Sequence, residues 1–524
     1  MPADAAMHLE AAADGKGEFE AWSGACAGTG ACDLTLSSDA AVSATFRERK
    51  VRLAVTVDGQ GRIRSTPAGL DCSGTCSATF AAGTSVRLEA SSADGFAFSG
   101  FAGNCSGMSC QLELSDSKAV AAAFVVVMDT LTVRVRGDGR GRVVSTPPGI
   151  ECGSGAACSS IFPRNSEVRL VAVPDTISKV EFWSGLCAGE PCTVKMRGDG
   201  AVDLSLALRR YAVVDLGVAE GDWWSGASAI SARGEVVAGN SGGPGRPVLF
   251  TPAMQPLGIE RGWVVGVSSN RTVAGNHQGP TDANGYPTWH PFRWSKGALK
   301  DLPFLPQGTY GYATAMNENG IVVGYSAYGN SPGRAVYWND SGITDLGSLG
   351  QDWIACSNAF GINRAGVIVG ESCTRLSALH AARFRAPGAI DDLGTLGGNH
   401  SRATGINDGG DIVGFSDLSQ GNGAHGFFWR DGSMTDAGAL AGHSNSQLSA
   451  VNNRGVAVGM SYNPNQWPLT GILYLDGRVI ALDDLLDDRR SVHVSEAAAI
   501  DDSNAIVGTA SIFGATRAVL LRPK

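Results

Sequence analysis

The sequence predicts an all-β protein, a seven-bladed β-propeller preceded by two and a half small disulfide-containing all-β repeat modules. Three observations support this fold class. The 524 residues contain two repeat periods, one of about eighty residues and one of about 45. Apolar and polar residues alternate between glycine-rich turns, as in strands joined by hairpins. The twelve cysteines fall into close pairs. We expect a partial module at 1–48, modules at 49–127 and 128–209, and the propeller at 210–524.

The composition excludes several classes of protein. Hydrophobic residues make up 43% of the chain, which is enough for packed cores, and the 71 glycines follow no collagen period, so we assign them to turns. Charged residues make up only 17%, and the net charge is −9. Surfaces that bind nucleic acid or membranes need clustered Lys and Arg, so we expect neither partner. No apolar run reaches the roughly eighteen residues of a transmembrane helix, so we expect no transmembrane segment.

The N-terminal part of the chain repeats with the longer period. VDGQGRIRSTPAGLDC at 57–72 matches GDGRGRVVSTPPGIEC at 137–152, and the segment 86–105 matches 168–187. Alternating residues at 131–136, followed by a glycine-rich turn, predict strands joined by hairpins. Each module is therefore expected to consist of short strands without helices.

The beginning of the chain matches only the second half of this unit. HLEAAADGKGEFEAWSGAC at 8–26 aligns with 87–105, so the chain is expected to begin inside a module. The first thirteen residues lack the basic and apolar regions of a signal peptide. We expect the missing strands and a signal peptide to be encoded upstream of Met1. An in-frame stop codon directly upstream would contradict this expectation.

The cysteines predict disulfides and an oxidising compartment. Reduced thiols and zinc are the alternatives, but zinc ribbons favour two residues between paired ligands, and none of these pairs has that spacing. Closely spaced cysteines bridge only where the chain turns between them, which Gly and Ser permit here. Cross-pairing within a module, such as Cys76 with Cys105, stays open. The predicted disulfide cysteines are Cys26 with Cys32, Cys72 with Cys76, Cys105 with Cys110, Cys152 with Cys158, Cys187 with Cys192 and Cys356 with Cys373.

Two motifs of the modules resemble a known family. The pattern Phe-x-x-Trp-Ser-Gly-x-Cys at 19–26 and the run G-x-G-x-V-x-S-x-P-x-G-I-x-C at 139–152 resemble the divergent internalin B-repeat-like modules of bacterial surface proteins. The resemblance covers about 1–208 and departs at 98–101, where FSGF replaces the aromatic-then-Trp order. Such modules are mostly spacers or adhesive stalks, so the resemblance implies a location at the cell surface more than a chemistry.

Three landmarks recur seven times after residue 210, which predicts seven four-stranded blades. The first landmark is an apolar β-branched run that ends in Gly, found at 236–239, 272–275, 321–324, 367–370, 411–414, 456–459 and 505–508. The second is a strand of small and aromatic residues, found at 246–250, 290–294, 334–338, 380–384, 425–429, 470–474 and 517–521. The third is a short strand around Asp-Leu, marked by Asp215, Leu257, Asp301, Asp345, Asp392, Asp436 and Asp484.

The order of these landmarks favours a closed ring over a solenoid. The region begins with an Asp-Leu strand at 211–217 and ends after an aromatic strand at 517–521, so the last blade lacks one strand and the N-terminus holds a spare one. Pairing these two strands would close the ring and leave no open sheet edge. An open solenoid gives no reason for the region to begin and end at different strands of the repeat.

A turn of the form Asn-x-x-Gly precedes most of the β-branched runs, because Asn accepts local backbone bonds and Gly tolerates positive φ. One such turn, from Asn363 to Gly366, lies midway between Cys356 and Cys373. The two cysteines should therefore face each other across a hairpin. With a two-residue loop they would form a non-hydrogen-bonded pair, and a bulge would shift this pattern by one residue.

The segment DLGTLGGNHSRATGINDGGDIVG at 392–414, followed by HGFFW at 425–429, closely resembles the HAF family of probable extracellular repeats. All seven units share this resemblance, most weakly in the first two and the last. The resemblance implies export from the cell and supplies no catalytic residues. We therefore predict no catalytic, cofactor-binding or metal-binding residues and no cofactor.

Two enzyme-like motifs are better explained by turns. GNSGGP at 239–244 is similar to the sequence around a serine-protease nucleophile, but the only preceding histidine, His8, lies in a module, and Gly239 holds a repeat position. Ser-x-x-Lys at 115–118 resembles a β-lactamase motif but lies in a polar turn without the helix that the motif needs. We expect neither activity.

Three further motifs also fall on hairpin turns. The tripeptide Arg-Gly-Asp occurs at 136–138 and 197–199, and the other module has Val-Asp-Gly at the first of these positions. GDGRG at 137–141 imitates a phosphate-binding loop, but no helix follows it to hold the phosphate. Turn chemistry is the expected role of all three.

The recurring charged side chains are also expected to be structural. His290, His380 and His425 share one repeat position that Arg246, Arg334 and Arg517 also occupy, and equivalent positions on different blades do not converge on one metal. We interpret the aspartates of the Asp-Leu strands as hydrogen-bond acceptors in turns or between blades. The acidic cluster of Asp483, Asp484, Asp487 and Asp488 lacks calcium-loop spacing, so we expect it to be solvated.

The leading hypothesis is a secreted or cell-surface, non-enzymatic binding, adhesion or scaffold protein, whose modules carry a monomeric propeller that binds an extracellular glycan or protein. The alternative is an extracellular polysaccharide-acting hydrolase or lyase that uses the axial cleft of the propeller. A third hypothesis is a purely structural spacer. An enzyme should have two or more carboxylates, or a His and a Tyr, together in that cleft with perturbed pKa values.

Overall fold

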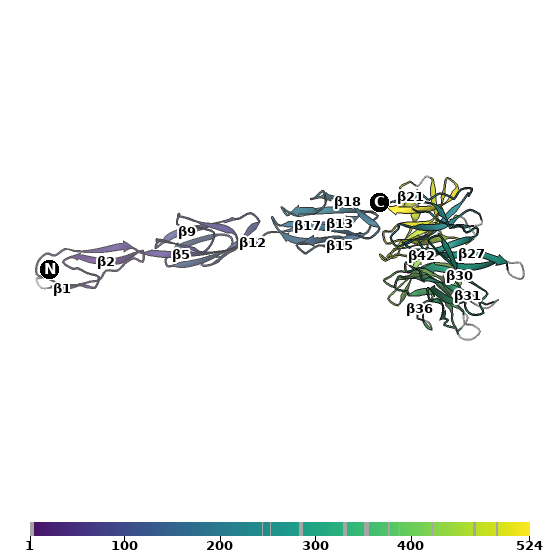
Figure 1. Ribbon diagram of the computed structural model, residues 1–524. Helices are drawn as coiled ribbons and strands as arrows, with labels where there is room; N and C mark the ends of the chain where they lie inside the picture. The colour runs from purple at the N-terminus through teal and green to yellow at the C-terminus, as the bar shows by residue number, and fades with distance from the viewer. Residues whose placement is uncertain are drawn as a thin grey trace. The chain divides into compact units, whose positions relative to one another are not determined.

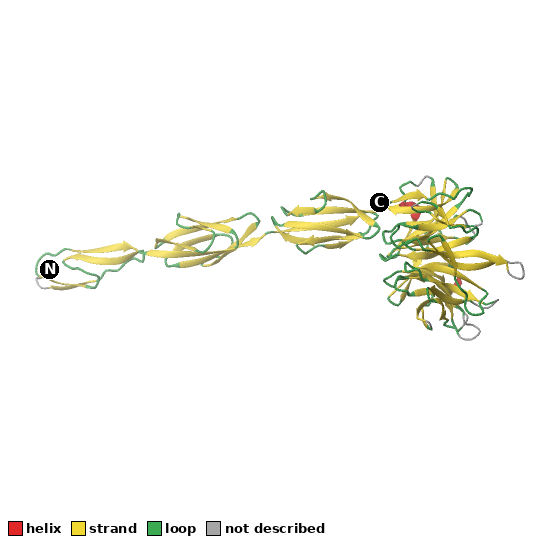
Figure 2. Ribbon diagram, in the orientation of Figure 1, coloured by secondary structure: helices red, strands yellow, loops and turns green. Residues whose placement is uncertain are grey.

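The protein, described here from a computed structural model, is all-β (Figure 2). The structure describes residues 5–243, 245–251, 253–281, 287–328, 333–350, 356–375, 378–386, 388–421, 423–464, 468–488 and 491–524. Among these residues, helical structure is confined to α1 (Leu482–Leu485) and a 3-10 turn at Ser419–Gly421. The chain divides into two compact units. The first comprises Met1–Asp175 and Lys179–Ala207, and the second comprises Thr176–Ser178 and Leu208–Lys524.

The first unit contains two pairs of facing four-stranded sheets (Figure 1). The first pair has the strand orders β10-β12-β5-β8 and β11-β9-β6-β7, and the second has β16-β13-β20-β18 and β15-β14-β17-β19. The strands of the first pair are β5 (Lys50–Asp58), β6 (Gly61–Thr66), β7 (Asp71–Cys72), β8 (Cys76–Ala81), β9 (Thr84–Ser92), β10 (Phe96–Gly103), β11 (Cys110–Leu114) and β12 (Lys118–Val126). The strands of the second pair are β13 (Met128–Arg136), β14 (Gly141–Thr146), β15 (Glu151–Gly153), β16 (Ala157–Pro163), β17 (Glu167–Pro174), β18 (Ser178–Gly185), β19 (Cys192–Lys195) and β20 (Gly200–Leu208).

Each pair of sheets encloses its own core. Leu53 and Ile63, from opposite sheets, are fully buried in the first core, and Val133 and Val168 are fully buried in the second. Alternate residues of each strand face the core, as the period-two pattern requires. In both pairs the first and last long strands are parallel neighbours. These are β5 with β12 in the first pair and β13 with β20 in the second. The two sequence repeats therefore have one topology.

The N-terminal segment contains half of this arrangement. Strand β1 (Ala5–Leu9) pairs with β3 (Cys32–Leu36), and β2 (Gly17–Gly24) pairs with β4 (Val42–Glu48). These pairings repeat those of β9 with β11 and of β10 with β12, including a bulge at the same place in β2 and β10. The alignment of 8–26 with 87–105 is thereby reflected in the strand pairing.

The second unit contains, within its described residues, seven four-stranded antiparallel sheets. The first holds β22 (Ser225–Ile230), β23 (Val237–Ser241), β24 (Arg246–Leu249) and β25 (Gln255–Pro256), the second β26 (Gly262–Val267), β27 (Val273–Thr281), β28 (Pro287–Ser295) and β29 (Ala298–Asp301), the third β30 (Tyr310–Met316), β31 (Val322–Ala327), β32 (Arg334–Asn339) and β33 (Gly342–Gly347), and the fourth β34 (Ser357–Ile362), β35 (Ile368–Cys373), β36 (Leu379–Ala386) and β37 (Ala389–Asp392). The fifth holds β38 (Gly397–Ile406), β39 (Ile412–Leu418), β40 (Ala424–Arg430) and β41 (Ser433–Gly438), the sixth β42 (Asn445–Val451), β43 (Ala457–Tyr462), β44 (Thr470–Leu475) and β45 (Arg478–Ala481), and the seventh β46 (Val492–Ile500), β47 (Ile506–Ile512), β48 (Ala515–Pro523) and β21 (Tyr211–Asp215).

We call β22, β26, β30, β34, β38, β42 and β46 the inner strands. Each contacts the inner strand of the next sheet in the chain, and β46 also contacts β22. In the seventh sheet, β21 pairs with β48, from Tyr211 opposite Pro523 to Asp215 opposite Val519. The predicted pairing of the spare Asp-Leu strand with the last aromatic strand is therefore confirmed. It joins the first and last strands of this unit through backbone hydrogen bonds.

The β-branched runs that end in Gly form the second strand of each sheet, and the Gly faces a bulge in the inner strand. A Cβ at Gly370 would overlap the carbonyl oxygen of Asn358, so the close approach of the two strands requires glycine. The inner strand there bulges between Ala359 and Gly361. The same overlap would occur at Gly239, Gly275, Gly324, Gly414, Gly459 and Gly508.

One predicted strand is shorter than expected. Asp484 was assigned to an Asp-Leu strand, but β45 ends at Ala481 and Asp484 lies in α1. Leu482 and Leu485, one helical turn apart, are both buried in the core of the unit. Burial of these two leucines on one side favours a helical turn over a continued strand.

Candidate functional site

A cavity of about 280 Å³ lies between the inner strands, and all seven of them line it. Its walls come from the bulged segment of each strand, so the side chains are small or aliphatic apart from Phe360. Thr314 and Thr404 each donate a hydrogen bond from Oγ1 to a carbonyl of the next inner strand, Ala359 O and Leu448 O, both at 2.6 Å. Both threonine hydroxyls therefore bond to the fold itself.

The Asn-x-x-Gly turns lie at one end of the inner strands, which we call the turn end. Here Asn363 has two functions, because its Oδ1 accepts the backbone N–H of Val367 at 2.9 Å while its Nδ2 donates to the carbonyl of Asn407, in the next sheet, at 3.1 Å. Asn317, Asn407 and Asn452 repeat this arrangement, and all four side chains are buried. We call these four residues the asparagine belt.

A second set of bonds runs beside the belt at the turn end. Asp408 accepts the backbone N–H of Arg364 at 2.9 Å, Asn453 accepts that of Asp408 at 2.8 Å, and Asp502 accepts that of Asn453 at 2.9 Å. The Asn-x-x-Gly motif predicts a turn, and the structure has a turn at each of these positions. The bond to the next sheet was not foreseen, because the partner lies about one repeat away in the chain.

The other end of the inner strands, which we call the variable end, carries a different residue type on each sheet. One register position there is occupied by Gly226, Trp263, Tyr312, Asn358, Arg402, Gln447 and Glu496. In most repeats the preceding residue is Ser or Gly. This variation between otherwise similar repeats was the available sequence signal for a functional position, and sequence reasoning missed it.

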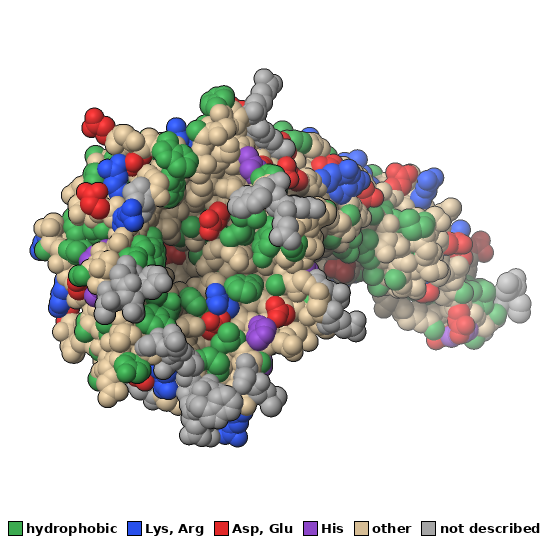
Figure 3. Space-filling model, turned by 90° about the vertical axis from the view of Figure 1, so that its right-hand side faces the viewer, with side chains coloured by type: hydrophobic (Ala, Val, Ile, Leu, Met, Phe, Trp, Pro, Cys, Tyr) green, Lys and Arg blue, Asp and Glu red, His purple; other side chains and the backbone are tan. Residues whose placement is uncertain are grey.

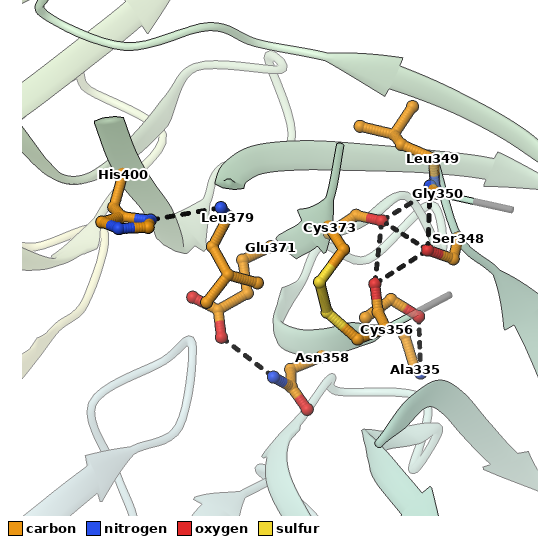
Figure 4. The surroundings of a disulfide bond; sticks show 12 residues. Ala335, Ser348, Leu349, Gly350, Cys356, Asn358, Glu371, Cys373, Leu379 and His400 are labelled. Carbon is orange, nitrogen blue, oxygen red and sulfur yellow. Dashed lines mark hydrogen bonds between the residues drawn. A yellow bond between two sulfur atoms is a disulfide. The ribbon is translucent and has the colours of Figure 1, made fainter. Parts of the chain in front are cut away.

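Three of the polar groups at the variable end form one network. Glu371, which is almost fully buried, accepts bonds from Arg402 Nε at 2.7 Å and Nη2 at 3.1 Å, and from Asn358 Nδ2 at 2.9 Å. Figure 4 shows Asn358 and Glu371 pointing toward one another beside a disulfide. The Arg402 guanidinium also lies over the ring of Phe360, 4.5 Å from its centroid. The paired charges leave this network with no net charge.

Burial also shifts pKa values at this end. Burial raises the pKa of Glu496, and no other cause contributes. Burial also raises the pKa of Tyr325 to about 12, with smaller effects from Tyr312 and Tyr310. The face that carries the β27–β28 hairpin is hollowed at its centre, with hydrophobic, acidic and basic side chains around the hollow (Figure 3).

The cysteines pair locally in the structure. The six disulfides of the described chain join Cys26 to Cys32, Cys72 to Cys76, Cys105 to Cys110, Cys152 to Cys158, Cys187 to Cys192 and Cys356 to Cys373. Their Cα atoms lie 5.2 to 6.3 Å apart, the usual span of a disulfide. The cross-pairing of Cys76 with Cys105 does not occur.

Cys356 and Cys373 face each other across the β34–β35 hairpin, but as a hydrogen-bonded pair. The N–H of Cys373 donates to the carbonyl of Cys356 at 2.9 Å, so the pair is not that of a simple two-residue loop but the arrangement shifted by one residue that was expected with a bulge. The turn is one residue longer, because Asn363 bonds to Val367. The bulge at Phe360 restores the opposition of the cysteines and shifts the hydrogen-bonding pattern by one residue.

Four of the six recurring histidines and arginines pair with an aspartate of their own sheet. His380 Nδ1 lies 3.0 Å from Asp392, His425 Nδ1 lies 2.9 Å from Asp436, and Arg334 and Arg517 pair with Asp345 and Asp215. Each of these aspartates also accepts the N–H of the glycine two residues later, which is a turn role. The remaining two basic residues differ, because His290 contacts Thr288 and Arg246 pairs with Asp222. No group of three potential metal-ligating side chains occurs in the described parts of the chain.

The acidic cluster around α1 is not simply solvated, which corrects the sequence-based expectation. Asp483 accepts bonds from His493 Nδ1 at 2.7 Å and from the N–H of Val494 at 2.9 Å. The bond to Asp483 raises the pKa of His493. Asp487 pairs with Lys524. These contacts tie α1 and the residues after it to the seventh sheet.

The enzyme-like motifs occupy structural positions. Ser241 is fully buried, and its Oγ accepts the N–H of Ala219 at 2.9 Å and donates to the carbonyl of Trp224 at 3.4 Å. Pro244, the last residue of that motif, lies outside the described residues. Ser115 donates to Asp116 at 3.1 Å in the turn between β11 and β12. Neither serine contacts a histidine or lysine base among the described residues.

The remaining motifs also lie in turns. Arg136 ends β13 and pairs with Asp203 at 3.1 Å, and strand β14, not a helix, follows the glycine-rich turn at 137–141. In the second Arg-Gly-Asp, Asp199 accepts the N–H of Thr130 at 2.6 Å. None of the helices that the structure describes has the length and apolar character needed to cross a bilayer.

Comparison with known proteins identifies one part of the chain. Residues 53–128 match the family of the divergent InlB B-repeat domain. The segment spans β5 to β12 and the two sheets that they form, so the resemblance stated for the modules is confirmed for this one. No curated protein matches the chain.

Proposed function

We propose that residues 210–524 form a closed seven-bladed β-propeller of HAF-like repeats, preceded by modules at 1–48, 49–127 and 128–209. Three observations support closure. Strand β46 contacts β22, β21 pairs with β48, and one cavity is lined by all seven inner strands. In this arrangement each sheet is a blade, and pairing β21 with β48 removes the open edges that a linear array would leave.

We also propose that the protein is secreted or held at the cell surface, where it binds an extracellular ligand through the variable end of the propeller. The disulfides support an oxidising compartment, and the InlB-type module supports a surface location. The observation that carries the binding role is the variable register position, at which seven similar strands present seven side chains of different chemistry. Repeated scaffolds commonly place specificity on such positions.

Binding is favoured over catalysis by the state of the carboxylates. The cavity between the inner strands is lined by small and aliphatic side chains apart from Phe360. At the variable end Glu371 is held by Arg402 and Asn358, and at the turn end Asp408 and Asp502 accept backbone N–H groups. Glycosidases need two carboxylates aimed at one bond, and here Glu371, Asp408 and Asp502 bond to the fold, which leaves Glu496 without a second such carboxylate at the variable end.

The function is tested by probing glycan and protein arrays with the full chain and assaying it against the same polysaccharides for product release. We expect saturable binding to at least one probe and no turnover. Product release that is lost in Glu496→Gln would overturn the binding proposal in favour of the enzyme. An absence of binding on both arrays would favour the spacer. Fractionation of the producing cell, with detection of the protein outside the cytoplasm, tests the location.

A further inference from the structure

Four aromatic side chains form a continuous row at the variable end, which we call the aromatic row. The ring centroids of Trp289 and Trp263 lie 4.8 Å apart, those of Trp263 and Tyr312 lie 5.8 Å apart with nearly parallel planes, and those of Tyr312 and Tyr325 lie 5.4 Å apart. The row crosses from the second sheet to the third. All four side chains are half-buried, so each ring is supported from below while part of it faces solvent.

The polar atoms of the aromatic row have no hydrogen-bond partner among the described residues. This holds for the indole N–H of Trp263 and Trp289 and for the hydroxyls of Tyr312 and Tyr325. Two other indoles bond to backbone carbonyls, although the buried indole N–H of Trp183 has no partner either. The N–H of Trp338 donates to the carbonyl of Pro303 at 2.7 Å, and that of Trp22 donates to the carbonyl of Gly30 at 2.8 Å. The partly exposed row therefore combines apolar rings with free polar groups, the combination that suits amphipathic ligands.

The row continues into the network of Glu371. A Cβ at Gly333 would lie 3.0 Å from both the Tyr325 ring and Asn358 Oδ1, so these two side chains are close neighbours. Asn358 donates to Glu371, which Arg402 neutralises. Asn358 Oδ1 accepts no bond within the described chain and remains available to a donor. A ligand that follows the row therefore meets hydrogen-bonding groups without net charge at its end.

We infer that the aromatic row and Asn358 form a binding site for a neutral polysaccharide. Pyranose rings present flat C–H faces, which stack on aromatic rings, and hydroxyl edges, which pair with indole N–H, phenol and amide groups. The separations between the ring centroids are comparable with the length of one sugar unit. A proline-rich peptide also stacks on aromatic grooves, and its carbonyls can accept from the indole N–H groups, but proline has no N–H to donate to Asn358 Oδ1. This inference rests on the proposed binding function and names its ligand class.

The test uses the full chain, titrated with soluble neutral hexasaccharides of β-1,4-linked glucose, mannose and xylose, with oligogalacturonate, and with a polyproline peptide. Binding is measured by calorimetry and by quenching of tryptophan fluorescence. We expect at least one neutral hexasaccharide to bind. The variant Trp263→Ala/Tyr312→Ala should weaken that binding by about tenfold or more, since central aromatic contacts dominate binding energy. Phe182→Ala, which removes an exposed aromatic in the first unit, is the matched control and should leave affinity unchanged.

Thermal unfolding of each variant shows whether it is folded. If the double variant unfolds, Trp263→Phe and Tyr312→Phe retain the packing, and each should still weaken binding by about threefold through the loss of a polar edge. The inference is overturned if no neutral hexasaccharide binds, if the aromatic substitutions leave affinity unchanged, or if only the polyproline peptide binds. Binding of a protein or peptide without glycans would overturn this inference while the proposed binding function stands. Failure of every glycan and protein probe would remove both.

Discussion

The two ends of the seven-sheet unit are built from the same strands but use their side chains differently. At the turn end the asparagine belt repeats one residue type, and each amide bonds both to its own turn and to the next sheet. At the variable end one register position ranges from Gly226 to Trp263, Arg402 and Glu496. Identical side chains at equivalent positions satisfy the same backbone groups in the four sheets that carry them, so they serve stability. Dissimilar side chains cannot do this, and they are free to serve recognition.

The largest expected effect is the loss of one belt residue. Asn407→Ala removes bonds to the Asn452 carbonyl at 2.9 Å and to the Asp411 N–H at 2.9 Å, and leaves buried polar groups unpaired. We expect the free energy of unfolding to fall by about 3 kcal/mol. The matched change at the other end, Asn358→Ala, should cost about 1 kcal/mol or less, because Arg402 still holds Glu371. Chemical denaturation measures both, and equal losses would contradict the division between the two ends.

A second prediction concerns the disulfide at the variable end of the fourth sheet. Replacing Cys356 and Cys373 by Ser opens a loop with a sequence separation of 17 and should cost about 3 kcal/mol in the chain-entropy model. The control, with Cys72 and Cys76 replaced by Ser, opens a separation of 4 and should cost about 2 kcal/mol, in the first unit only. Calorimetry should show that the two replacements lower the melting temperatures of different unfolding transitions. If the Cys356 pair has no effect, the variable end needs no covalent support.

The smallest effect is a pH dependence that arises at the variable end. Burial raises the folded-state pKa of Glu496, so the folded state binds its proton more tightly than the unfolded state. Stability is therefore greatest below the unfolded pKa and declines as pH rises through the folded pKa. Glu496→Gln should remove this decline, so its melting temperature relative to wild type should increase from about pH 4 to about pH 8. A relative melting temperature that falls over this range would show that the carboxylate is stabilised when ionised.

Much of the fold follows from local patterns. The β-branched runs, the aromatic strands and the Asn-x-x-Gly turns each predict a strand or a turn from a few neighbouring residues, and β31, β32 and β35 occupy the expected places. The opposition of Cys356 and Cys373 was also predicted from the turn between them. Its hydrogen-bonding type depended on whether the hairpin holds a bulge, and the bulge at Phe360 shifts the ladder by a residue without changing which side chains meet.

The candidate site was not predictable in the same way. Trp263 and Tyr312 lie in different repeats, and their stacking depends on how two sheets pack. Glu371 and Arg402 are 31 residues apart and meet for the same reason. The sequence motifs that attracted attention, such as those around Ser241 and Ser115, are conspicuous because they are contiguous. In the structure Ser241 ends strand β23 and bonds to nearby backbone groups, and Ser115 bonds to the Asp116 side chain in a turn.

The sequence by itself determined the strands, the repeats and the local cysteine pairs. These depend on the alternation of side chains, on the φ preferences of Gly and Asn, and on short loops, all of which act over a few residues. Only the tertiary structure decided which asparagine bonds to which carbonyl and which aromatic rings form a row. Those contacts join residues of neighbouring sheets, and the packing of one sheet on the next sets their distances.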